Sequence, residues 1–459
     1  MGGVQVICFH NGFLLIYPRT KQWTEKRQKV CALYDRIHGT FILILFGGSP
    51  MKMDMDRIAI TGMGVISPIG NNLEDFWENL INGRCGIRTI RGFDVTGLRT
   101  QIGGEVDNFS PTDYMDLKTA KRCARFTQFA LAAVDQAIRD AGVEINQQSR
   151  QNIGIYVGSS TCSLVDQEKL PKTALKAWPI FASLRDCNHS TAYNIACFYN
   201  LTGPTMTLTS ACNSSSNALE IAMDQMRLSK ISKAIVIGTE ALSQMAYQTL
   251  ALSQGMSRRN EAPEKASRPF DRERDGFVVS EGSGAIILEK LTDAAKRGVK
   301  PYAVLAGCAS TNDGYSIYKC EPSGQEISRA MHQALTYAKK DKSQISYVSA
   351  HGPSMPDTDR AETLAIKRTF GLGSSELKIS SIKGALGSPL GATNILQVIA
   401  TSKSIAESVI PPTINLEHPD DVCDLDYVPR DAREMTINCA IINSHAYGGG
   451  NTSVVLEKI

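Results

Sequence analysis

The stretch Met206-Thr-Leu-Thr-Ser-Ala-Cys-Asn-Ser-Ser-Ser216 is the clearest indication of how this chain folds and acts. An apolar β-type run opens it, and apolar residues at helical spacing follow it between Leu219 and Met226. Cys212 is therefore expected where a strand turns into the first turn of a helix. Unpaired amides and the helix dipole at such a turn favour a thiolate and an oxyanion. A buried structural thiol is the alternative for a single cysteine.

Length and composition limit the class of protein. The chain has 459 residues, of which 42% are hydrophobic and 21% charged, as in a globular protein with a large core or two packed halves. No apolar run is long enough for a membrane span. Residues 1–50 hold six basic and two acidic side chains, and the other 43 basic and 44 acidic residues nearly cancel. This near-neutral body argues against nucleic acid as a partner.

The twelve cysteines are scattered along the chain, without a CxxC pair or a Cys/His cluster at zinc-like spacing. This pattern predicts reduced thiols in a cytoplasmic protein, with no metal site. Residues 1–52 mix basic and aromatic residues without the periodic pattern of the rest, and they show no signal-peptide pattern. We interpret them as an N-terminal extension outside the fold, with Met51, Met53 or Met55 as the functional start.

From Arg57 onward, apolar strand-like runs alternate with helical runs, which predicts an α/β protein with largely buried sheets. One helix is expected from about Asn72 to Asn82, and a long one from about Lys118 to Asp140, ended by Gly142. Three basic residues gather at the start of the long helix, and they form either a solvated face or a docking patch for an acidic partner. They are Lys118, Lys121 and Arg122.

A second stretch repeats the plan around Cys212. Residues Ile379–Ser388 read as a strand and a turn of small residues, and the apolar helix Ile395–Ile405 follows. The chain is therefore predicted to consist of two similarly built halves, residues 53–295 and 296–459, with stacked sheets.

Polar residues concentrate in turns of the second half. Tyr347-Val-Ser-Ala-His351 reads as a strand that delivers a histidine to a glycine turn, and Glu362 belongs to the helix that follows. Lys383 lies in the repeated turn, and Asn443-Ser-His-Ala-Tyr-Gly-Gly-Gly-Asn451 is a glycine-rich loop between apolar strands. This loop lacks the lysine of a nucleotide-phosphate loop, which argues against ATP. A lone histidine is usually structural, so the whole set carries the argument.

These motifs, in this order, resemble those of type II β-ketoacyl-acyl carrier protein synthases, the condensing enzymes of the thiolase superfamily, over about residues 56–459. The similar motifs are the nucleophile turn Ser210-Ala-Cys212, the mid-chain signature Phe270–Gly282, the histidine motif Ala350-His351-Gly352 with Pro356, Asp359 and Glu362, the lysine turn Ser381-Ile-Lys383, and the closing loop Asn443–Asn451.

The resemblance implies a thiolase-like five-layered α-β-α-β-α fold built from two similar halves. It also implies a homodimer, or a heterodimer with another ketosynthase, that works without a cofactor on acyl and malonyl groups carried by acyl carrier protein. Cys212 would take the acyl group as a thioester. Malonyl-carrier protein would then lose CO2, and its carbanion would attack the acyl-enzyme to give a 3-oxoacyl product for fatty-acid or polyketide synthesis.

The resemblance further implies a role for each matching residue. The amides of Cys212 and His445 would form the oxyanion hole, and His351 would donate to the malonyl thioester oxygen. Lys383, paired with Glu362, would orient the site. The acidic carrier protein would meet a basic patch that consists of Lys118, Lys121, Arg122 and Arg259.

Two positions depart from the pattern of the family. Ser388 stands where the family has its second histidine, and losing one such donor costs about 10²–10³ in rate. His445 stands where the family has its gating phenylalanine. Two interpretations follow: His445 replaces the missing imidazole, or both changes mark a site released from elongation. In the second case, a lesser activity or a role without chemistry is expected.

Two further functions compete with that of an active condensing enzyme. One is a chain-length-factor-like partner subunit, and the other is acyl transfer or malonyl decarboxylation without elongation. A thiolase is disfavoured because the closing loop holds His445 rather than a second cysteine. A papain-like hydrolase lacks its cysteine signature.

Overall fold

The computed structural model describes residues 6–10, 13–17, 57–161, 185, 187–253, 255–371 and 377–459. The chain divides into two units, Met1–Met53 and Asp54–Ile459. In the first unit, β1 (Val6–His10) pairs antiparallel with β2 (Phe13–Tyr17). The alternative start sites at Met51, Met53 and Met55 lie outside the described residues, and the predicted domain boundaries stay predictions.

A ten-stranded mixed sheet forms the centre of the second unit, in the order β12-β11-β15-β16-β10-β3-β9-β8-β6-β7. Its first five strands along the chain are β3 (Ile58–Ile66), β6 (Ile153–Gly158), β7 (Thr205–Leu208), β8 (Lys233–Glu240) and β9 (Gly282–Lys290). The other five are β10 (Ala303–Asn312), β11 (Tyr347–Ser349), β12 (Lys378–Ser380), β15 (Cys439–His445) and β16 (Gly450–Glu457). Two small ribbons pair β4 (Ile87–Thr89) with β5 (Ile102–Gly104) and β13 (Val409–Ile410) with β14 (Arg433–Glu434).

The two halves of this sheet have the same topology. From the centre outward, each half places its first, fifth, fourth, second and third strand in that order. The first–fifth and fifth–fourth pairs are antiparallel, and the fourth–second and second–third pairs are parallel, in both halves. β3 and β10 pair antiparallel where the halves meet. This repetition confirms the two similarly built halves predicted from the sequence.

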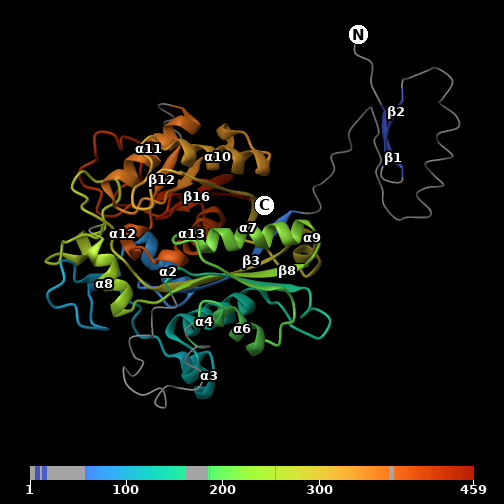
Figure 1. Ribbon diagram of the computed structural model, residues 1–459, viewed down its shortest axis with the longest axis horizontal. Coiled ribbons are helices and arrows are strands. Elements are labelled where there is room, and N and C mark those ends of the chain that lie inside the picture. The colour runs from blue at the N-terminus through green and yellow to red at the C-terminus, as the bar shows by residue number, and fades with distance from the viewer. Residues whose placement is uncertain are drawn as a thin grey trace, which may run out of the picture. The chain divides into compact units, whose positions relative to one another are not determined.

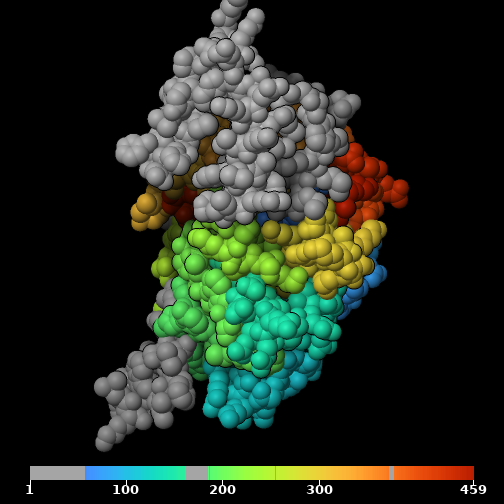
Figure 2. All heavy atoms as spheres, turned by 90° about the vertical axis from the view of Figure 1, so that its right-hand side faces the viewer, coloured from blue at the N-terminus to red at the C-terminus, as the bar shows by residue number. Residues whose placement is uncertain are grey.

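Helices and sheet halves alternate as five layers (Figure 1). The outer helices are α4 (Arg125–Ala141) and α6 (Ser190–Phe198) on the first half, and α10 (Gln325–Ala338) and α11 (Pro356–Phe370) beside the second. Between the halves lie α7 (Ser214–Arg227) and α13 (Thr393–Glu407), which contact each other and strands of both halves. Figure 2 shows the first half in cyan and green below residues of the second half in orange and red. The five-layered α/β fold is confirmed.

A glycine lets the central helix α7 approach the sheet. A Cβ atom on Gly158, at the end of β6, would lie 2.2 Å from the backbone nitrogen of Ser215, so no other residue fits there without a backbone shift. This close contact fixes the first turn of α7, and with it Cys212, against the strands.

Of the two helices predicted before Cys212, the first is confirmed and the second is not. α2 (Leu73–Ile81) begins after Asn72, whose side chain accepts from the amide of Asp75. The single long helix expected from Lys118 is wrong, because the chain is extended at Cys123 and Ala124. Two helices result, α3 (Leu117–Arg122) and α4, and Gly142 ends α4 in the left-handed conformation.

The break between α3 and α4 has a visible cause. Gln128 in α4 donates its side-chain amide to the carbonyls of Ala120 and Cys123, which a continuous helix would use internally. The remaining helices are α8 (Gln244–Leu252), α9 (Leu291–Lys296) and α12 (Lys383–Leu386). No helix in the described part of the chain is long and apolar enough to cross a membrane. The cytoplasmic location stays a prediction.

Candidate active site

One pocket brings together four of the residues singled out in the sequence. Cys212 and Ser388 follow β7 and β12, His351 follows β11, and His445 ends β15. All four line the pocket, although the first and the last are 233 residues apart in numbering. Lys383 and Glu362 lie behind its wall and are buried.

Cys212 occupies a constrained turn at the start of α7. The preceding Ala211 has a φ of 52°, in the left-handed region that only a tightly held side-chain-bearing residue adopts. The hydroxyl of Ser214 accepts from the amide of Ser210 at 2.9 Å and donates to the carbonyl of Ala211 at 2.6 Å. Ser444 also donates to the carbonyl of Cys212, at 3.3 Å. The thiol is therefore presented from a backbone that is fixed on both sides.

The pocket favours the neutral thiol of Cys212. Burial raises its pKa to about 11, and the positive charge of Lys383 offsets only part of this effect. The thiolate expected from the helix N-terminus is therefore not the favoured form, because desolvation outweighs the nearby charge. A base must take the thiol proton during attack.

His351 supplies a neutral imidazole. Its side chain is buried, and its Nδ1 has no hydrogen-bond partner among the described residues. Burial lowers its pKa well below the usual value, and the nearby Lys383 and His445 lower it further. The backbone holds the residue, because its amide donates to Glu362 at 2.8 Å and its carbonyl accepts from Lys383 at 2.5 Å. A neutral ring can accept a proton or donate a hydrogen bond.

Glu362 is a buried carboxylate that collects donors. It accepts from the amides of His351 and Gly352 at 2.8 Å each, and from the side chain of Asn443 at 3.2 Å. Burial alone would raise its pKa, but His445 and these amides outweigh it and hold the pKa below the usual value. Glu362 therefore stays ionised and fixes the turn that carries His351.

The expected pairing of Lys383 with Glu362 is wrong. No ion pair within 4.0 Å joins these two described side chains; the Nζ of Lys383 donates to the carbonyl of His351 and, at 3.3 Å, to the side-chain oxygen of Gln397. Gln397 is held in turn by donating to the carbonyl of Ala350 at 2.9 Å. Burial lowers the pKa of Lys383 to about 8, although the charge of Glu362 partly opposes this.

His445 contacts His351 and Glu362. The two imidazole rings meet edge to face, with centroids 5.2 Å apart. The Nε2 of His445 lies 3.4 Å from Oε1 of Glu362, and its Nδ1 lies 3.1 Å from Oδ1 of Asn451. The basic side chain within 4.0 Å of Glu362 is thus that of His445, where the sequence predicted Lys383, and its Nε2 has no hydrogen-bond partner among the described residues.

Ser388 presents a hydroxyl where the resemblance predicts an imidazole. Its amide donates to the carbonyl of Val278 at 2.7 Å, and its carbonyl accepts from the amide of Ser280 at 2.9 Å. These two bonds tie the turn to the strand-like segment before β9, and the residue lines the pocket. The position can donate one hydrogen bond but cannot carry charge.

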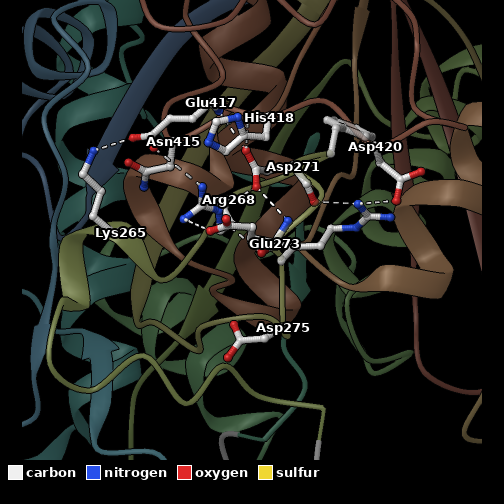
Figure 3. Close-up of polar contacts among 12 residues, drawn as sticks. Lys265, Arg268, Asp271, Glu273, Asp275, Asn415, Glu417, His418 and Asp420 are labelled. Atoms are coloured by element: carbon white, nitrogen blue, oxygen red, sulfur yellow. Dashed lines mark hydrogen bonds and ion pairs between the residues drawn. The ribbon is translucent and has the colours of Figure 1, made fainter.

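The mid-chain signature forms a polar network with residues far away along the chain, such as Glu417 and His418 (Figure 3). The buried Arg268 bonds to Asp271 at 2.9 Å, and Asp271 accepts from the amides of Glu417 and His418 at 2.8 and 2.7 Å. The amide of Arg268 also donates to the hydroxyl of Ser354, at 3.0 Å, in the turn that follows His351. This network ties the signature to residues 415–420 and to the histidine turn.

The four residues of the predicted basic patch do not line the pocket. Lys118, Lys121 and Arg122 lie exposed on α3. Arg259 is half-buried and engaged within the chain: its guanidinium lies 3.5 Å from Glu273 and 3.9 Å from Asp275. Arg259 is therefore less available to a partner than the three residues on α3.

The sequence analysis did not predict the roles of two polar residues around the site. Gln397 holds Lys383, and Asn443 donates to Glu362. Both are fully buried, and a polar residue within an apolar run is the signal that points to such a role. Among the described residues, no group of three or more His, Cys, Asp or Glu side chains is arranged to hold a metal ion.

Comparisons with known proteins agree with this geometry. Residues 55–294 match the family model of the beta-ketoacyl synthase N-terminal domain, and residues 302–417 match that of the C-terminal domain. The 3-oxoacyl-[acyl-carrier-protein] synthase 2 of Synechocystis is 39% identical over 416 residues, which cover 89% of this chain and 99% of the relative. Fold, pocket and sequence together define a condensing enzyme: the chain belongs to the β-ketoacyl synthase family.

Two solved structures share the fold along most of both chains. One holds a type II PKS acyl-carrier protein in complex with its ketosynthase bound to the hexaketide; it has a TM-score of 0.81 and 28% identity, and covers 88% of this chain and 99% of that one. The ishigamide ketosynthase/chain length factor has a TM-score of 0.80 and 28% identity, with the same coverage.

Proposed function

We propose that this chain condenses an acyl group held on Cys212 with malonyl-acyl carrier protein, releasing CO2 and giving 3-oxoacyl-acyl carrier protein. The observation that carries the proposal is the placement of a constrained cysteine and a neutral histidine in one pocket, at Cys212 and His351. The family relationship adds the class of reaction, in fatty-acid or polyketide synthesis.

In the acyl-transfer step, His351 takes the proton of the Cys212 thiol, since burial keeps both groups neutral beforehand. The sulfur attacks the acyl thioester, a new thioester forms on Cys212, and the carrier thiolate leaves with the proton. The amides of Cys212 and His445 are our proposed donors to the oxyanion, which the site must stabilise. No external oxidant or cofactor is required for this exchange of one thioester for another.

In the condensation step, malonyl-carrier protein loses CO2, and the electron pair moves onto the thioester oxygen as an enolate. We assign the donor to this oxygen to the ring of His351 and a second, weaker donor to the hydroxyl of Ser388. The carbanion attacks the acyl carbon, and the Cys212 thiolate leaves. Because Ser388 lacks an imidazole, this step is expected to be about 10²–10³ slower than with two histidines.

The two groups behind the wall support this chemistry without touching substrate. Lys383 holds the carbonyl of His351 and lowers the pKa of Cys212 against the effect of burial. Glu362 fixes the amides of His351 and Gly352. Both are positioning residues in this proposal.

The carrier protein is proposed to dock on α3. Lys118, Lys121 and Arg122 are exposed there, and an acidic partner would gain from their charge. The double variant Lys121→Glu/Arg122→Glu should raise the KM for carrier protein. The rate at which a small acyl-pantetheine acylates the enzyme should stay unchanged, because this substrate lacks the carrier protein. Lys230→Glu, an exposed lysine after α7, is the matched control.

A dimer is also part of the proposal. β7 is the end strand of the sheet, and its Met206 is 42% exposed. Nearby in sequence, α6 exposes Tyr193 and Phe198. An edge strand with apolar neighbours offers free backbone groups to a second copy or to another ketosynthase. Sedimentation equilibrium of the purified chain distinguishes a homodimer from a monomer that awaits a partner.

Purified protein incubated with acyl- and malonyl-carrier protein should yield 3-oxoacyl-carrier protein, measured as intact carrier mass, with Cys212→Ala as the control. Product from the Cys212→Ala protein would contradict the proposal. The similarity to the ishigamide ketosynthase/chain length factor supports one alternative, a partner subunit that shapes the product of an intact synthase. A stable homodimer that is fully active alone excludes this alternative.

A further inference from the structure

Glu240 is a buried carboxyl group that the proposed chemistry does not use. It ends β8, is fully buried, and does not line the pocket. A carboxyl group in the interior is stabilised only by nearby donors or charges, because burial removes its hydration. Burial accordingly raises the pKa of Glu240, and backbone amides oppose this rise. The positions of these donors show which parts of the fold the residue holds together.

Four donors of described residues converge on the two carboxyl oxygens of Glu240. Oε1 accepts from the amide and from the hydroxyl of Thr161, at 2.8 Å each. Oε2 accepts from the amide of Ser160 at 2.9 Å and from the amide of Gly391 at 3.0 Å. Ser160 and Thr161 follow β6 in the first half of the fold, whereas Gly391 follows β12 in the second. One buried side chain therefore joins the two halves.

Gly391 belongs to a turn that lines the pocket. This turn, residues 388–391, contributes Ser388 and Leu390 to the pocket wall. Leu390 has a φ of 39°, in the left-handed region that a residue with a side chain adopts only when its surroundings hold it. A Cβ atom on Gly391 would lie 2.7 Å from the backbone nitrogen of Ser160, so the turn packs directly against the first half.

Glu240 holds one end of this turn, and the sheet side holds the other. Ser388 is tied through its amide and its carbonyl to the segment before β9. Beyond Leu390, the amide of Gly391 bonds to the side chain of Glu240. Because a buried amide without an acceptor is unfavourable, loss of the carboxyl group would release this end of the turn. The strained Leu390 lies between the two anchors.

We propose that Glu240 is a positioning residue for malonyl decarboxylation: from behind the pocket wall it fixes residues 388–391 and thereby aims the Ser388 hydroxyl at the malonyl thioester. Glu240 touches neither the substrate nor the reacting atoms. The turn of Cys212 is fixed by other contacts, those of Ser214 and Ser444, so acylation does not depend on Glu240. This inference deepens the proposed function and rests on it for the identity of the step.

Two variants of similar size test whether the acceptor matters. Glu240→Gln keeps an oxygen that can accept from Ser160 and Gly391 while its nitrogen donates to the Thr161 hydroxyl, whereas Glu240→Met fills the space without a comparable acceptor. We expect Glu240→Met to slow malonyl decarboxylation about tenfold and Glu240→Gln to slow it at most about threefold. Acylation of Cys212 should stay within about twofold of wild type in both. Equal decarboxylation rates in the two variants, or an equal loss of acylation, would overturn the proposal.

A double-mutant cycle with Ser388→Ala separates aiming of the hydroxyl from a general structural role. Once the hydroxyl is gone, Glu240 has nothing left to aim, so Glu240→Met should slow decarboxylation less than about twofold in the Ser388→Ala background. The same loss in both backgrounds would contradict the proposal. If Glu240→Met does not fold, as judged by urea unfolding, Glu240→Asp replaces it in the cycle, because its shorter side chain withdraws the carboxyl group from Gly391.

Crystal structures of wild type and Glu240→Met give a readout that does not depend on activity. Residues 388–391 should shift in the variant, while the turn of Cys212 stays in place. A wild-type protein that yields no 3-oxoacyl product contradicts the proposed function, and the position of residues 388–391 still decides the role of Glu240. An unmoved turn in Glu240→Met would overturn the proposal.

Discussion

The turns after β7 and after β12 hold equivalent places in the two halves, since each follows the third strand of its half. In the first turn, Cys212 lies just before the regular helix α7, which begins at Ser214. The second turn contains the short helix α12, which starts at Lys383 and ends before Ser388. Burial acts on both turns alike: it raises the pKa of the Cys212 thiol to about 11 and lowers that of Lys383 to about 8.

The difference between these turns suggests a division of the proposed reaction: the first turn serves acyl transfer and the second serves decarboxylation. In our proposal the first turn supplies the nucleophile, Cys212, whereas the second supplies a buried amine and, at Ser388, a hydroxyl where the resemblance predicts an imidazole. A change confined to the second turn leaves the acyl-transfer chemistry of the first in place. We therefore expect acylation and decarboxylation to respond separately to mutation.

The largest effect is expected at the first turn. Cys212→Ala removes the only group in our proposal that bonds to the acyl chain, so acyl-enzyme and 3-oxoacyl product should both fall to background. Intact mass of the enzyme and of the carrier measures the two species in one sample. Acylation of the variant would place the nucleophile elsewhere.

His351→Ala should slow both steps, because the ring serves as base for Cys212 and as donor to the malonyl thioester. We expect condensation to fall by about 10²–10³. Single-turnover acylation and malonyl decarboxylation, measured separately, test this shared role. Normal acylation in the variant would show that the base for the first turn is another group.

The smallest effect concerns stability and comes from Lys383. Its pKa of about 8 in the folded protein lies below the ordinary 10.5, so the unfolded chain binds the extra proton between these values. Folding stability is therefore reduced by this lysine below pH 8 and recovers as pH rises toward 10.5. Relative to Lys383→Met, wild type should gain about 2 kcal/mol between pH 7.5 and 9.5. Urea unfolding at both values measures the change, and a pH-independent difference would contradict the lowered pKa.

Sequence patterns predicted the fold well because its elements are local and periodic. The repeat was visible in the two strand–turn–helix stretches, and both halves have that plan. The break at Cys123 was missed because a side chain five residues later, that of Gln128, captures a carbonyl there. Periodicity does not report such a contact.

The sequence predicted which residues form the candidate site but not the contacts among them. Cys212, His351, Ser388 and His445 share one pocket, yet the basic side chain that lies 3.4 Å from Glu362 is His445, which is 83 residues away in numbering. The choice between His445 and Lys383 depends on where α11, α12 and β15 meet in space. Spacing along the chain does not determine this.

The central claim is that the turn after β7 controls acylation and the turn after β12 controls condensation. Its most direct test is to measure the rate constants of both steps in Ser388→His. We predict that restoring the imidazole raises the condensation rate about a hundredfold, from a second donor to the enolate, while the rate of Cys212 acylation stays the same. Both are read by intact mass in single-turnover experiments on wild type and variant. An unchanged condensation rate, or an equal rise in acylation, would contradict the account.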